Sequence, residues 1–239
     1  MAYPFQFTKA EIVDIVVSVV AIALALTLSQ GGGIDGIMKV PAADFVSLFT
    51  LFLFTIGIGF VLHEIMHKYY AIKFGAWAQF QAWTLGLALM FGMALFLPIL
   101  FIAPGAVVIY ANSVSRRENG VISVVGPLTN IAISVLFLVI GIAGMAFVGG
   151  DFGTLTIFSQ KVSVFFVGAG VNAFLAFFNM LPVPPLDGSK VIVWDFRIWL
   201  GVTLISFVLM TITGMGFDLV SLVIVLVFAL LYRNMMRFG

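Results

Sequence analysis

Long apolar runs, separated by short polar segments, extend along the whole chain. Five of these runs have about the 20 residues that a helix needs to cross the hydrocarbon core of a bilayer, and a sixth follows them. They cover residues 12–29, 45–68, 123–148, 162–181, 199–216 and 218–236. The pattern predicts an all-α polytopic membrane protein with about six transmembrane helices.

One further apolar stretch, residues 84–110, is interrupted by Pro98, Pro104 and Gly105. Two full crossings need about 40 residues, so this stretch is too short to leave and return. We expect a re-entrant or β-hairpin-like apolar insertion between the second and third spans, with short strands in residues 78–83 and 106–114 on either side. Irregular backbone at membrane depth must pack on protein or line a cavity, which predicts that the insertion lies against the other helices.

The basic residues support a path in which residues 84–110 do not cross. On that path nine of the eleven lysines and arginines lie on one side of the membrane. They are Lys9, Lys68, Lys73, Arg116, Arg117, Lys190, Arg197, Arg233 and Arg237. Because positively charged loops remain in the cytosol, we expect both termini, and the ends of the second and fourth spans, to face the cytosol.

The composition narrows the class of protein further. The chain is 63% hydrophobic and 9% charged, and a net charge of +1 excludes a strongly basic surface for nucleic acid. It contains no cysteine, so any metal must be held by His, Asp or Glu. The N-terminal stretch lacks the basic region and cleavage site of a signal peptide, so we expect its apolar run to stay as a helix. We expect a single transmembrane domain over residues 1–239, with no soluble accessory domain.

The second span ends in HEIMH, residues His63 to His67, which contains the only two histidines of the chain. On a helix these histidines share one face and can bind one metal ion together. Glu64 is turned about 100° away, where it can reach a water on the metal without being a ligand. Two histidines for zinc and a glutamate as general base are typical of zinc metalloproteases. Ionisable groups cost roughly 2.5–3.5 kcal/mol at the centre of a membrane helix, which argues against an incidental cluster.

A catalytic zinc site needs a third protein ligand, and Asp187 is the best candidate. It lies in NMLPVPPLDG, at the end of the fourth span and on the same side as His67. Three prolines prevent a regular helix there, and Gly188 allows a sharp turn, so the carboxylate can be aimed inward. The remaining carboxylates are expected at helix starts or in polar loops: Glu11, Asp14, Asp35, Asp44, Glu118, Asp151, Asp195 and Asp218.

HEIMH, NMLPVPPLDG and GPLTN (residues 126–130) together resemble the motifs of the site-2 protease family of intramembrane zinc metalloproteases, over roughly residues 45–190. The resemblance implies that His63, His67 and Asp187 bind one zinc ion and that Glu64 activates water. It also implies that Asn179 helps to hold the substrate. The expected function is regulated intramembrane proteolysis of transmembrane protein substrates within the lipid bilayer. Residues 84–101 depart from the compact members as an apolar insertion, and the PDZ and CBS modules of other members are missing.

Asn130 is expected to form an ordinary hydrogen bond between neighbouring helices.

Two alternative functions remain open from the sequence. The first is a metal transporter, because intramembrane His, Glu and Asp side chains also occur along an ion path. The second is a non-catalytic relative that binds membrane proteins, although it would have no use for Glu64.

Overall fold

The computed structural model describes residues 3–97, 102, 104–110 and 114–215, together with the single positions 225, 227 and 230. These residues are mostly helical, and three of their helices are long and apolar enough to cross a membrane. The three are α1 (Lys9–Gln30), α3 (Ala42–Lys73) and α5 (Arg116–Phe147). They coincide with the first three predicted spans, as expected of a membrane protein.

The remaining helices are shorter. They are α2 (Gly33–Gly36), the 3-10 helix η1 (Ile37–Lys39), α4 (Thr84–Phe96), α6 (Val164–Asn179), α7 (Asp187–Trp194) and α8 (Phe196–Ile212). The fourth and fifth predicted spans correspond to α6 and α8, which have 16 and 17 residues. Helices of this length rise about 25 Å, less than the roughly 30 Å of a bilayer core. The sixth predicted span, 218–236, lies outside the described residues except at the three single positions, so six crossings stay a prediction.

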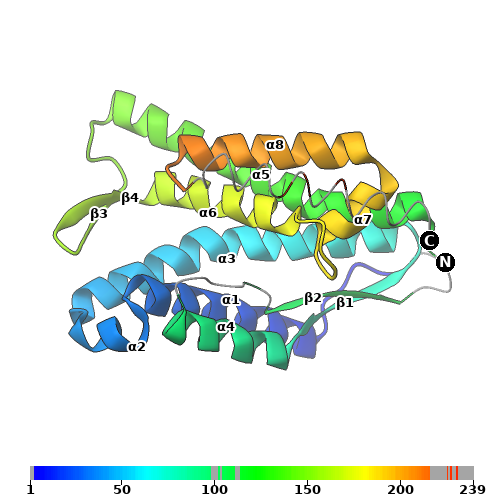
Figure 1. The fold of residues 1–239 in the computed structure, drawn as a ribbon, viewed down its shortest axis with the longest axis horizontal. Coiled ribbons are helices and arrows are strands. Elements are labelled where there is room, and N and C mark those ends of the chain that lie inside the picture. Colours follow the sequence, from blue (N-terminus) through cyan, green and yellow to red (C-terminus); the bar gives the residue numbers. More distant parts are fainter. Residues whose placement is uncertain are drawn as a thin grey trace.

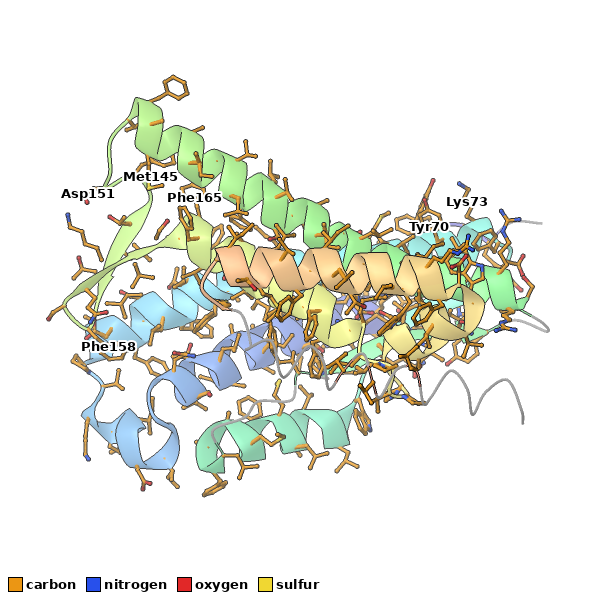
Figure 2. The ribbon with its side chains drawn as sticks, turned by 45° about the horizontal axis from the view of Figure 1, so that its top comes forward. Tyr70, Lys73, Met145, Asp151, Phe158 and Phe165 are labelled. Atoms are coloured by element: carbon orange, nitrogen blue, oxygen red, sulfur yellow. The ribbon has the colours of Figure 1, made fainter. Side chains whose placement is uncertain are left out.

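Helix α3 lies at the centre of the fold and contacts α1, α5 and α6 (Figure 1). Small residues bring these helices close together, because a Cβ at Gly57 would lie 3.1 Å from Val19 Cγ1, and one at Gly59 would overlap the side chain of Asn172. Apolar side chains from α1 and α3 fill the space beside this contact. Figure 2 shows Lys73 at one end of the bundle and Asp151 at the opposite end.

A two-stranded antiparallel sheet flanks α4. Strands β1 (Trp77–Ala82) and β2 (Gly105–Tyr110) pair with Phe80 opposite Val107. The strands predicted at 78–83 and 106–114 are thereby confirmed in part: β1 ends at Ala82 and β2 is described as far as Tyr110, residue 114 is not in a strand, and residues 111–113 lie outside the described residues. The insertion also contains the 13-residue helix α4. Its re-entrant path through a bilayer stays a prediction.

A second sheet makes the all-α prediction wrong at one place. Strands β3 (Thr154–Ile157) and β4 (Gln160–Ser163) form a hairpin between α5 and α6, where the sequence predicts a loop and the start of a span. The turn residues Phe158 and Ser159 have φ values of 50° and 61°. Such turns normally contain Asn or Gly, and here the sequence offers neither.

Candidate metal centre

The two predicted histidines lie one turn apart near the C-terminal end of α3. The Nε2 atoms of His63 and His67 lie 2.9 Å apart, and Oδ2 of Asp187 lies 3.4 Å and 3.1 Å from them, respectively. One potential ligand atom from each side chain lies within 4.8 Å of the others. All three residues are buried, with exposed fractions of 4%, 7% and 8%. The structure therefore joins residues 120 positions apart into the cluster that the sequence predicts.

The break between α6 and α7 delivers Asp187 to this cluster. Helix α6 ends at Asn179, the proline-containing segment follows, and Asp187 is the first residue of α7. Gly188 does not form the sharp turn that we predict, because it lies inside α7 and its φ is not positive. It is needed for close approach, since a Cβ there would overlap the Met180 carbonyl, which accepts a 2.7 Å hydrogen bond from Trp199 Nε1.

The second nitrogen of each imidazole is fixed by helix α5. Nδ1 of His63 donates to Asn130 Oδ1 at 2.5 Å, and Nδ1 of His67 donates to the Ile122 carbonyl at 2.6 Å. When Nδ1 carries the proton, the lone pair of a neutral imidazole is on Nε2. Both Nε2 lone pairs therefore face each other and Asp187.

Asn130 is the centre of a wider buried network. Its Nδ2 donates to the Gly59 carbonyl at 3.2 Å and to Asn172 Oδ1 at 3.1 Å. The Nδ2 of Asn172 in turn donates to the carbonyls of Thr55 and Gly168 at 3.1 Å and 2.8 Å. The predicted bond between helices is present, but the prediction missed the bond from His63, which makes Asn130 an orienting partner of the cluster.

Gly126 lies directly behind the two histidines. A Cβ at this position would be 2.5 Å from His67 Nε2 and 2.6 Å from His63 Nε2, closer than non-bonded atoms allow. Any side chain would occupy the space of the cluster. The GPLTN motif contains both Gly126 and Asn130, so it is the sequence signal for this wall of the site.

The donor set fits a zinc ion. Two imidazole nitrogens and one carboxylate oxygen are the protein ligands of many catalytic zinc sites, which keep a fourth position open. Zinc-binding histidines usually donate the N–H of their other ring nitrogen to a fixed acceptor such as a backbone carbonyl. Here the acceptors are the Asn130 side-chain amide and the Ile122 carbonyl. Within the described part of the chain, no other group of this kind is present.

Glu64, the residue after His63 on α3, lines the same cavity as the cluster. It is buried, and its Oε2 accepts a 3.1 Å hydrogen bond from the backbone N–H of Val107 on β2. Glu64, the three clustered residues and strand β2 line one cavity of about 410 Å³. The carboxylate is thus not part of the cluster but faces the space beside it.

Asn179 lines this cavity as well. Its Nδ2 donates to the Leu175 carbonyl one turn earlier in α6, at 2.9 Å. Lys190 also lines the cavity, and its Nζ lies 3.7 Å from Asp187 Oδ1. The structure brings all five residues singled out from the sequence to one cavity.

Comparisons with known proteins agree with a zinc site. A protein of Methanocaldococcus jannaschii named "Putative zinc metalloprotease MJ0611" is 38% identical over 210 residues, which cover 86% of this chain and 96% of that protein. A protein of Bacillus subtilis named "Putative zinc metalloprotease YwhC" is 28% identical over 155 residues, 62% of this chain and 69% of that protein. No family model and no solved structure matches the chain.

The apolar helices and the buried His-His-Asp cluster define a zinc metalloprotein with a membrane-protein fold. The chain belongs to the zinc metalloprotease family of the Methanocaldococcus jannaschii protein.

Proposed function

We propose that this chain is an intramembrane zinc metalloprotease of the site-2 protease family. It hydrolyses peptide bonds within or near the transmembrane helices of membrane-anchored substrates, as in regulated intramembrane proteolysis. The whole chain, residues 1–239, acts as one transmembrane domain, and its partners are the lipid bilayer and transmembrane proteins rather than nucleic acid.

One observation carries this proposal. The histidines and Glu64 belong to α3, a 32-residue apolar helix that is long enough to cross a membrane, and they are buried among further apolar helices. Ionisable groups are energetically costly in such apolar surroundings, so their presence there indicates a function. A protease site built into a spanning helix is suited to substrates that lie in the same membrane.

The residues of the cavity support a division of roles. A zinc ion held by His63, His67 and Asp187 would polarise the scissile carbonyl and lower the pKa of water to about 7. Glu64 takes the proton from the attacking water and returns it to the leaving amine. Asn179 lies on the wall of the cavity and would hold the substrate backbone by its side-chain amide.

A transmembrane substrate must first unwind, because the amides of a helix are bonded to carbonyls four residues away. Strand β2 offers an edge for the unwound segment, since the Val107 N–H faces the cavity rather than β1. An added substrate strand would form backbone hydrogen bonds along this edge. A carbonyl of this substrate strand would accept from the Val107 N–H in place of Glu64, so that the Glu64 carboxylate could accept from water.

The charge distribution supports a cytosolic site and cytosolic termini. Lys73 ends α3, Arg116 begins α5, and Arg197 lies in the first turn of α8. These helix ends lie at one end of the bundle, and the β3–β4 hairpin lies at the other (Figure 1). The basic end is the one that a membrane protein leaves in the cytosol.

A paired-substrate assay tests the proposal. The purified, zinc-loaded protein is given a single-span substrate with Pro or Gly in its helix, and a second substrate in which Leu replaces those residues. We expect cleavage of the first and a lower rate for the second, because Pro and Gly lower the cost of unwinding by about 3 and 1 kcal/mol, respectively.

The same preparation in vesicles separates the alternatives. Zinc uptake into vesicles without cleavage would replace the proposal with a metal transporter. Binding of the substrate without cleavage or uptake would replace it with a non-catalytic membrane-protein-binding relative.

A further inference from the structure

Two carboxylates on α1 close the outer edge of strand β1. Oε1 of Glu11 accepts from the Phe80 N–H at 3.0 Å, and Oδ2 of Asp14 accepts from the Ala82 N–H at 3.1 Å. Residues three apart on a helix share a face, and N–H groups two apart on a strand share an edge. The side chains of α1 therefore supply the acceptors that a third strand would otherwise provide.

The opposite edge of the sheet is open to the cavity. Phe80 pairs with Val107 and Ala82 with Gly105, so the backbone groups of these two β2 residues face away from β1. By the same alternation Ile109 shares their edge. All three β2 residues line the cavity, where Glu64 accepts from Val107. The sheet thus has one edge closed by α1 and one edge directed at the metal centre.

A buried ion pair fixes this sheet relative to the metal helix. Nζ of Lys68, the residue after His67, lies 2.7 Å and 2.5 Å from the two carboxylate oxygens of Glu11. The exposed fractions of the Lys68 and Glu11 side chains are 2% and 1%. Nζ of Lys68 also donates to the Gln6 carbonyl at 2.6 Å. One carboxylate therefore joins α3, beside the cluster, to the backbone of β1.

We propose that Glu11 and Asp14 are positioning residues that set the register of the substrate against the metal centre. They hold β1, β1 holds β2, and the free edge of β2 then presents each backbone position at a fixed distance from His63 and His67. If the hydrogen bonds from α1 to β1 are lost, the two strands can shift, and the substrate can pair with β2 in more than one register. Registers that keep the same side chains inward differ by two residues, so cleavage would spread to bonds two positions away. This inference rests on the proposed proteolytic function.

The position of the cut bond tests the inference. Asp14 is only partly buried, so Asp14→Ala is expected to fold. Mass spectrometry of the products from one transmembrane substrate should show one cut for the zinc-loaded wild type and for Asp14→Asn, whose amide oxygen still accepts from Ala82. Asp14→Ala should add cuts two residues away without loss of zinc. A single unchanged cut in Asp14→Ala would overturn the inference.

Asp44 provides a matched control. Its Oδ1 accepts from the Phe158 N–H at 3.1 Å, the same kind of bond, but at the β3–β4 hairpin. Asp44→Ala should keep the single cut. If it scatters the cuts as Asp14→Ala does, general loosening of the protein is the cause, and the positioning role is wrong.

Hydrogen exchange distinguishes failure of this inference from failure of the proposed function. If the wild type cuts nothing, the proteolytic function fails. Exchange of the amides in residues 77–82 then still tests whether the carboxylates of α1 hold β1. We expect exchange to be about fivefold faster in Asp14→Ala than in Asp14→Asn or Asp44→Ala, from the loss of one hydrogen bond. Equal exchange in the three variants would show that α1 does not hold the sheet and would overturn the inference.

Discussion

Nδ1 of His63 donates a 2.5 Å hydrogen bond to Oδ1 of Asn130, and this bond connects α3 to α5 inside the metal centre. It leaves Nε2 of the imidazole for the metal and fixes the plane of the ring. The Asn130 amide is itself held by Gly59 and Asn172. The orientation of a metal-binding side chain is therefore set by residues that do not touch the metal.

Asn130→Ala should weaken zinc binding by roughly 10–100-fold, because outer partners of metal-binding histidines contribute about that much. Zinc affinity, measured by competition with a chelator, checks this. Asn172→Ala removes support one bond further away, so its effect should be smaller. An Asn130→Ala protein that binds zinc like the wild type would show that the bond from His63 is incidental.

Gly126→Ala should lower zinc affinity by roughly tenfold or more, because the added Cβ would occupy the space of both imidazoles. In an ordinary helix the same change would stabilise by about 0.5–1 kcal/mol. Gly201 on α8 is the matched control, since a Cβ there meets nothing within 4 Å. We expect Gly201→Ala to keep zinc affinity and to gain about this small amount of stability. Equal zinc affinity in the two variants would mean that the site tolerates a side chain at Gly126.

Lys68→Met should destabilise the protein by about 3–5 kcal/mol, because it leaves the buried Glu11 carboxylate without its partner. Thermal unfolding in detergent measures the change. Lys161→Met is the control: Lys161 pairs with Asp151 at 2.6 Å, but the two side chains are 63% and 71% exposed. Exposed pairs contribute about 0–1 kcal/mol, so this variant should unfold close to the wild type. Similar losses in both variants would contradict the structural role of the buried pair.

Ile109→Pro should lower kcat/KM by about 3- to 10-fold, because it removes one N–H from the free edge of β2 while zinc content stays unchanged. Proline is tolerated at a sheet edge where its nitrogen faces away from the partner strand. Ile109→Ala keeps the N–H and separates the edge from the side chain. Wild-type kcat/KM in a folded Ile109→Pro protein would rule out substrate pairing at this edge.

The cluster itself was predictable from the sequence, because its signals are local. The i and i+4 spacing places His63 and His67 on one helical face, and the prolines before Asp187 predict that the helix ends there. The resemblance of GPLTN to a family motif pointed to Gly126 and Asn130, but their contacts with the histidines, and that of the Ile122 carbonyl, could not be predicted because they depend on the packing of α5 against α3. No local pattern specifies which helix lies behind the histidines.

The fold divides in the same way. Apolar length predicts α1, α3 and α5, and β-branched or alternating residues predict β1 and β2. The β3–β4 hairpin was missed because its turn consists of Phe158 and Ser159, which adopt positive φ without the usual Asn or Gly. Glu11 and Asp14 are at the start of a helix, as expected, but their bonds to β1 depend on a contact between segments nearly 70 residues apart.

The most direct test of the account is to measure zinc content and substrate cleavage together in purified wild type and Glu64→Gln. The substitution keeps the shape of the side chain and removes the base, and Glu64 is not part of the His-His-Asp cluster. We predict about one zinc ion per chain in both proteins and cleavage slower by at least about 100-fold in Glu64→Gln. Equal cleavage by the two proteins, or no zinc in either, would contradict the account.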